Sequence, residues 1–289
     1  MKKLKNIFVS TTFAKDDSKI SDILLMCKRA NISNVELGSN HAYEKNFVKI
    51  VNQYDFCFIV HNYFPIPKKS FVVNIASLNT HIRNLSLRHV KKAINFCKKT
   101  KSKLYTFHPG FVGDPMKASR KKKNYDFIWK QNILDKNYKL AFTHMLDSLR
   151  KIVNFAKKKN VRIAIETEGS AKRRNNFGLM QKPEEYQKLF KYFDPNDLGI
   201  NLNIGHLNLA SKAFGFSKII FVEDIEDYIV AIELSHNNGI EDQHLPIKKN
   251  AWYWKILKKK KFATVPIILE YRNCKISKIK KSIQLLNNS

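Results

Sequence analysis

A regular alternation of two kinds of segment constrains the fold most. Eight short apolar runs recur along the chain, each ending in a polar or small residue. Between them, apolar residues recur every three or four positions and lysines close the last turn, as in LRHVKKAINFCKKT. The runs predict strands, and the intervening segments predict amphipathic helices. The predicted strands span residues 6–10, 34–38, 56–61, 103–108, 162–167, 198–203, 229–234 and 265–271.

Continuous apolar strands joined by helices predict a parallel sheet that is buried on both faces. Eight strand–helix units in 289 residues fit a closed (β/α)8 barrel, a TIM barrel, better than an open doubly wound sheet. Because no linker or low-complexity stretch interrupts the pattern, we expect a single α/β domain over residues 1–289. The long loop at about 109–137 is expected to form a lid or a binding wall.

The lengths of the apolar runs also bear on the cellular location of the protein. None approaches the roughly 20 residues that cross a bilayer, and MKKLKNIFVSTTF holds too short an apolar stretch for a secretion signal. The four cysteines stand far apart, which disfavours a zinc knuckle or a disulfide framework. We therefore expect a cytoplasmic protein without a membrane partner; the sequence does not indicate an oligomeric state.

The net charge of +29 allows two interpretations. A polyanion such as nucleic acid would be attracted by such a charge. However, most of the 53 basic residues are lysines spread along nearly every predicted helix, a pattern that the codon bias of an AT-rich genome also produces. The clusters KASRKKK at 117–123 and KRR at 172–174 keep a nucleic-acid or phosphate partner open.

Polar residues gather where the predicted strands end. In a barrel of this kind, the carboxyl ends of the strands form the face that carries chemistry. Several buried carboxylates there need a compensating positive charge, and a divalent cation bound by His and carboxylate ligands supplies it. Such ligands suit zinc or manganese. The residues concerned are Glu36, His61, His108, Glu166, Asn203, Glu233 and Glu270, with His206, Asp242 and His244 shortly after their strands.

The ordered motifs FCFIVHNYF, YTFHPGF, IAIETEG, LNIGHLNLA, IELSHNNGIEDQH and IILEY resemble the xylose isomerase-like barrel superfamily. That superfamily contains endonuclease IV and many sugar phosphate isomerases and epimerases. The resemblance runs from the third strand to the C-terminus, roughly four-fifths of the chain. The stretches HNYFPIPKKSFVVNIAS and DQHLPI resemble an uncharacterised isomerase/epimerase-type branch more than endonuclease IV itself.

The resemblance implies one to three metal positions. Their ligands would be His61, His108 and Glu166 in the first, Glu166, Glu270, Asn203 and Glu233 in the second, and His206, Asp242 and His244 in the third. Asn203 and Glu233 depart from the family pattern, which has Asp and His at these positions. The two changes leave the total charge unaltered and predict a shift from zinc towards manganese or magnesium, with loss of this position as the alternative.

Three functions follow from the resemblance. The first is a metal-dependent isomerase or epimerase of a sugar or sugar phosphate, in which Glu166 and Glu270 move protons on carbon. Arg173 and Arg174 would hold a phosphate. Glu36 would either reach a substrate hydroxyl or make a structural hydrogen bond.

The second function is an endonuclease IV-like phosphodiesterase that acts on abasic-site DNA. Tyr63 and Phe64 would then wedge into the base stack, and the positive charge would bind the backbone. The third is a non-catalytic barrel that binds sugar or nucleic acid.

The alternation of side chains along a strand orders the candidates after the seventh strand. Residues three apart point to opposite faces, so Glu233 and His236 cannot both project into the barrel. Glu233 shares its parity with Ile229 and Ala231, and is therefore expected to point inward. His236 is expected in a loop near the substrate, and Glu241 is expected to face solvent.

Overall fold

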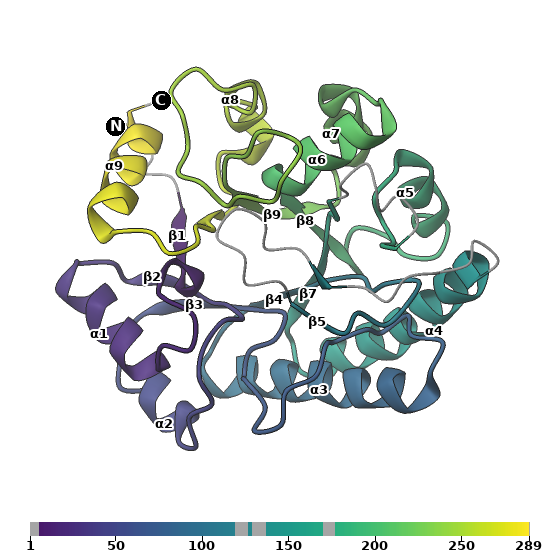
Figure 1. Ribbon diagram of the computed structural model, residues 1–289, viewed down its shortest axis with the longest axis horizontal. Coiled ribbons are helices and arrows are strands. Elements are labelled where there is room, and N and C mark those ends of the chain that lie inside the picture. The colour runs from purple at the N-terminus through teal and green to yellow at the C-terminus, as the bar shows by residue number, and fades with distance from the viewer. Residues whose placement is uncertain (1–5, 119–126, 129–136, 170–176, 289) are drawn as a thin grey trace.

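The computed structural model describes residues 6–118, 127–128, 137–169 and 177–288. Eight parallel strands close into a barrel in the order β1-β10-β9-β8-β7-β4-β3-β2, and helices surround it (Figure 1). Read around the ring, this is the order of the strands along the chain. The predicted single-domain (β/α)8 barrel is confirmed, and each of the eight predicted strands corresponds to one strand of the ring.

The bounds of the elements follow the predicted alternation. The barrel strands are β1 (Ile7–Ser10), β2 (Asn34–Leu37), β3 (Cys57–His61), β4 (Leu104–Phe107), β7 (Arg162–Glu166), β8 (Gly199–Asn203), β9 (Ile229–Leu234) and β10 (Ile267–Leu269). The helices are α1 (Ile20–Arg29), α2 (Phe47–Val51), α3 (Thr80–Lys99), α4 (Asn137–Lys157), α5 (Pro183–Leu189), α6 (Ile204–Phe214), α7 (Lys218–Ile225), α8 (Trp254–Leu257) and α9 (Ile276–Asn287), with short 3-10 turns at Thr11–Phe13 and Lys260–Phe262.

Local signals explain where several helices begin and end. The Asn79 side chain accepts hydrogen bonds from the backbone N–H groups of His81 and Ile82 at the start of α3. Asn203 caps α6 in the same way, directly after β8. That helix ends at Gly215, whose φ of 77° suits a residue without a Cβ atom. The cap on α6 fixes the orientation of a side chain that also faces the barrel mouth.

The barrel interior changes from apolar to polar along the strands. One buried layer contains Phe8, Ile59, Leu104, Ala164, Ala231 and Ile268. Side chains two residues apart on a strand share a face, so the next inward layer lies two residues further on. That layer is polar and buried, and it contains Ser10, His61, Thr106, Glu166, Glu233 and Glu270. The apolar layer thus forms the floor beneath a polar mouth.

The loop expected as a lid is described only in part. In it, β5 (Lys117–Ala118) pairs antiparallel with β6 (Phe127–Ile128). Residues 119–126 and 129–136 lie outside the described part, as do residues 170–176, which include Arg173 and Arg174. Among the helices that the structure describes, none combines the length and the apolar character needed to cross a bilayer.

Candidate metal centre at the barrel mouth

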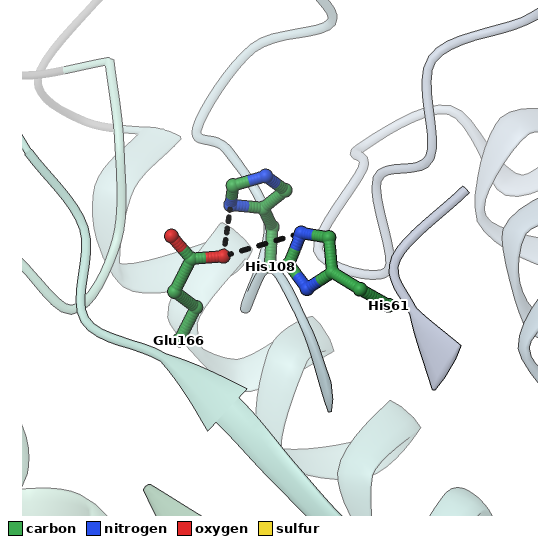
Figure 2. Close-up of side chains that lie close together, drawn as sticks. All are labelled: His61, His108 and Glu166. Atoms are coloured by element: carbon green, nitrogen blue, oxygen red, sulfur yellow. Dashed lines mark ion pairs between the residues drawn. The ribbon is translucent and has the colours of Figure 1, made fainter. Parts of the chain in front are cut away.

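His61, His108 and Glu166 converge at the mouth from three neighbouring strands (Figure 2). Glu166 Oε2 lies 3.6 Å from His61 Nε2 and 3.6 Å from His108 Nδ1. Glu166 is only 1% exposed, and within the described chain this oxygen accepts no hydrogen bond. A buried carboxylate oxygen that faces two imidazoles without a hydrogen-bond donor is suited to bind a cation.

Neighbouring side chains hold the two imidazole rings of this group. His61 Nδ1 lies 2.8 Å from Thr106 Oγ1, and His108 Nδ1 donates a hydrogen bond of 2.6 Å to Glu168 Oε1. Histidines that ligate metals are commonly oriented by a partner on one ring nitrogen, which presents the other nitrogen to the ion. His61 follows this pattern, because Thr106 contacts Nδ1 while Nε2 faces Glu166. In His108, Nδ1 faces both Glu168 and Glu166. Sequence reasoning missed Glu168, although it lies two residues after Glu166 in IETEG and shares its parity.

His206, Asp242 and His244 form a second group beside the first. Asp242 Oδ2 lies 2.8 Å from His244 Nε2 and 3.7 Å from His206 Nε2. His206 comes from the first turn of α6, and the other two come from the loop that follows β9. Of the residues described, none donates a hydrogen bond to Asp242 Oδ1, which is also buried.

Two carboxylates connect these groups. Glu166 turns Oε2 towards His61 and His108, while its Oε1 lies 2.9 Å from His206 Nδ1. Glu270, one residue beyond β10, places Oε2 3.2 Å from His244 Nδ1. The two predicted catalytic glutamates therefore belong to one continuous network of carboxylates and imidazoles.

Protonated histidines balance this network when no ion is bound. Burial lowers the pKa of His108 and of His244, but nearby carboxylates outweigh it and raise both pKa values to about 9. The pKa of His206 is likewise raised, because Glu166 and Asp242 outweigh burial. These protons occupy the positions where a metal would bring positive charge, so the donor set fits a divalent cation.

The pKa values of two carboxylates in this network are shifted in the opposite direction, below their ordinary values. Burial raises the pKa of Glu166, but the charges of His108 and His206 outweigh it and hold that pKa well below its usual range. The pKa of Glu270 falls to about 2, because His244 likewise outweighs burial. His61 differs from the other histidines, since burial lowers its pKa to about 4 and keeps it neutral, as a metal ligand must be.

Asn203 and Glu233, the two departures from the family pattern, face each other at the centre of the mouth. Asn203 Nδ2 donates to Glu166 Oε1 at 2.8 Å and to Glu233 Oε2 at 2.9 Å, and it lies 3.4 Å from Glu270 Oε2. Asn201 Nδ2 donates to Glu233 Oε1 at 2.7 Å. Glu233 points inward, whereas His236 forms a bridge with Leu245 in the following loop.

Glu36, His61 and Glu233 form a third group of potential ligands, and all three residues are buried. Burial, followed by the charge of Glu270, raises the pKa of Glu36 to about 8. Burial and three neighbouring glutamates raise the pKa of Glu233 well above its ordinary value. Glu36 is fully buried, so its carboxyl group lies among the inner side chains.

The aromatic residues expected to contact a substrate pack against other aromatic side chains. Phe64 is 1% exposed and packs against Phe47 and Phe96, so the expectation that it wedges into a base stack is wrong. Tyr63 packs against Phe71 and His89, and its hydroxyl accepts the N–H of Phe71. The loop after β3 therefore turns both rings towards the core.

Comparison with known proteins agrees with this architecture. An uncharacterised protein of Methanocaldococcus jannaschii is 26% identical over 218 residues, which are 74% of this chain and 65% of that protein. The chain thus spans just under two thirds of that relative's length. The crystal structure of a D-tagatose 3-epimerase-like protein aligns with a TM-score of 0.73 and 20% identity, covering 98% of each chain.

An AP endonuclease of family 2 from Brucella melitensis aligns with a TM-score of 0.62 and 10% identity, covering 94% of each chain. At these identities the likenesses show a shared fold. A match to a sequence family covers most of the chain. Residues 26–289 match the family described as xylose isomerase-like TIM barrel. The chain belongs to the xylose isomerase-like TIM barrel family.

Proposed function

We propose that the protein is a metal-dependent isomerase or epimerase that moves a proton on carbon in a sugar or sugar phosphate. The observation that carries this proposal is the pairing of Glu166 and Glu270 around one amide group. Asn203 Nδ2 lies 2.8 Å from an oxygen of Glu166 and 3.4 Å from an oxygen of Glu270. Paired carboxylates at a barrel mouth can transfer protons between adjacent carbons.

Glu166 and Glu270 have different neighbours, and their proposed roles differ accordingly. Glu166 contacts His61, His108 and His206, so it would hold the metal in addition to taking part in proton transfer. Glu270 lies beside His244 and is held in the ionised form, which is the protonation state that a general base requires. Arg272 Nη2 lies 4.0 Å from Glu270 Oε1 and brings further positive charge to the same edge.

His61, His108 and Glu166 would hold the metal in this mechanism. A divalent cation there would polarise the carbonyl and hydroxyl oxygens of the substrate and make the adjacent C–H bond more acidic. His108 and His206 remain partly exposed at the mouth, with 15% and 12% of their side-chain surface accessible. These edges are where a small polar substrate would approach the carboxylates.

A phosphodiesterase is the second candidate, and a specific observation favours it. The carboxylate of Glu166 faces one group of potential ligands with Oε2 and a histidine of the other group with Oε1. Neighbouring metal sites are typical of enzymes that cleave phosphate esters. The net charge of +29 would favour a nucleic-acid substrate.

Solvent deuterium exchange distinguishes the two activities. Protein loaded with manganese or zinc would be incubated in D2O with a panel of sugars and sugar phosphates, and mass spectrometry would detect deuterium on carbon. An abasic-site duplex would be tested in parallel for strand cleavage. The proposal predicts deuterium incorporation into at least one sugar and no cleavage.

The variant Glu270→Gln removes the proposed base, and Glu241→Gln serves as its matched control. Glu241 lies in the loop after β9, where it contacts Asn238 and Gln243. Incorporation should fall at least a hundredfold in Glu270→Gln and stay unchanged in Glu241→Gln. Cleavage of the duplex without any deuterium incorporation would favour the phosphodiesterase instead.

A further inference from the structure

We propose that the amide of Asn203 is a fixed divider, which occupies the centre of the mouth and restricts metal binding to the two flanking groups. The flanking groups are His61, His108 and Glu166 on one side, and His206, Asp242 and His244 on the other. The remaining group, Glu36, His61 and Glu233, is not independent of these positions, because it shares His61 with the first group and Glu233 with the central position. The central position lies between Glu166, Glu233 and Glu270, whose oxygens all face Asn203 Nδ2. This inference concerns the number of ions bound, and it rests on the metal sites of the proposed function.

The orientation of the amide is set from behind by the helix that it caps. Asn203 Oδ1 accepts the backbone N–H of His206 at 3.1 Å, in the first turn of α6. Since the oxygen faces an N–H donor, the NH2 group must face the carboxylates. An amide NH2 group has only donors, so it cannot bind a cation.

Reversal of the amide would break contacts on both sides. The NH2 group would then oppose the N–H of His206, and the oxygen would oppose carboxylate oxygens. Asn203 is fully buried, so water cannot replace the lost hydrogen bonds. The backbone N–H of Asn203 also donates to Thr167 Oγ1 at 2.8 Å, which ties the residue to the end of β7. The side chain therefore keeps one orientation.

The amide of Asn203 also partly compensates the negative charge of the surrounding carboxylates. Its two N–H groups serve the oxygens that a central cation would otherwise bind. Replacement of Asn203 by Asp would retain the cap on α6 and put a carboxylate oxygen where the NH2 group lies. Four carboxylates would then face one another, an arrangement that requires a cation or protons. Asn203→Asp should therefore create a third metal position.

Asn201→Asp is the matched control for that substitution. Asn201 is equally buried, lies on the same strand, and donates to Glu233 Oε1. Its Nδ2 group makes its described contact with Glu233 alone, whereas that of Asn203 faces three glutamates. Both substitutions introduce the same charge, but only the one at 203 places it at the centre.

The test is the number of manganese or zinc ions per chain at saturation, measured by elemental analysis after removal of unbound metal. Wild type should bind no more than two equivalents, Asn203→Asp should bind one more, and Asn201→Asp should bind the wild-type number. Three equivalents in wild type would overturn the inference. An unchanged number in folded Asn203→Asp, or an equal gain in Asn201→Asp, would overturn it too.

A second measurement covers the case in which Asn203→Asp does not fold. Wild-type protein saturated with 113Cd should give no more than two resonances, each at a shift typical of ligation by nitrogen and oxygen. A third resonance, at a shift typical of oxygen ligands alone, would overturn the inference. Both readouts count ions and are independent of turnover, so they separate this inference from the proposed activity.

Discussion

The carboxylate of Glu168 accepts a hydrogen bond of 2.6 Å from Nδ1 of His108. This contact fixes the ring of a histidine that faces Glu166 at the mouth. It also supplies negative charge that helps to raise the pKa of His108 to about 9 despite burial, which acts in the opposite direction. We therefore expect Glu168 to position His108 for the proposed metal.

Glu168→Gln should weaken metal binding without removing a ligand. Loss of a partner that orients a metal-binding histidine typically costs about 10-fold to 100-fold in metal affinity. Isothermal titration with zinc would measure the change, and Glu184→Gln, on the exposed surface of α5, is the control. Equal zinc affinities in Glu168→Gln and wild type would show that His108 is not oriented by this contact.

Metal affinity should rise steeply with pH up to about 9. The pKa values of His108 and His244 are raised to about 9, so both are protonated at pH 7 in the metal-free protein. A metal ion must displace these protons, which adds about tenfold in affinity per pH unit for each proton displaced. Titrations at pH 6, 7 and 8 in buffers of different ionisation enthalpy would report the affinity and the proton release. A pH-independent affinity would rule out these histidines as ligands.

Glu36→Gln should reduce the loss of stability of the metal-free protein at rising pH. Burial, followed by the charge of Glu270, raises the pKa of Glu36 from its ordinary value of 4.5 to about 8. A group whose pKa is higher in the folded state than in the unfolded state stabilises the folded protein. This stabilisation is complete at a pH below the unfolded-state pKa, and it is lost as the pH rises through the folded-state pKa. Each pKa unit corresponds to about 1.4 kcal/mol, so the variant should lose markedly less stability than wild type. Urea unfolding at pH 5 and pH 8.5 tests this, and parallel declines would contradict it.

Phe64→Ala should affect stability and leave metal binding unchanged. The ring is buried against Phe47 and Phe96, so its removal should lower the free energy of unfolding by about 3–5 kcal/mol. Urea unfolding measures this loss, and zinc titration of the folded variant provides the comparison. A variant with wild-type stability but weakened zinc binding would contradict this prediction and indicate that Phe64 contributes to the metal site.

Much of the architecture could be predicted because strand and helix periods are local properties of the sequence. The inward direction of Glu166 and Glu233 follows from the same alternation, since each lies two residues after an alanine of the apolar layer. Hydrogen-bond partners were harder to predict. Thr106 and Glu168 acquire their roles only when the barrel closes and brings neighbouring strands together.

Two other outcomes depended on tertiary contacts. The oxygen of Asn203 was predicted to coordinate a metal weakly or to form a hydrogen bond, and in the structure it accepts a hydrogen bond at the start of α6 while the NH2 group faces the carboxylates. Phe64 was expected to wedge into a base stack if the protein were a phosphodiesterase, but the loop directs it into the core. Neither the cap geometry nor the loop path is encoded by periodicity.

The proposal that His61, His108 and Glu166 bind a divalent cation is tested most directly by metal content. The wild-type protein is compared with the double variant His61→Ala, His108→Ala. Both proteins would be dialysed against zinc or manganese, freed of unbound ions and subjected to elemental analysis. We expect at least one tightly bound equivalent in wild type and a loss of about one equivalent in the double variant. Wild-type protein that retains neither metal, or a folded double variant that retains the full amount, would contradict it.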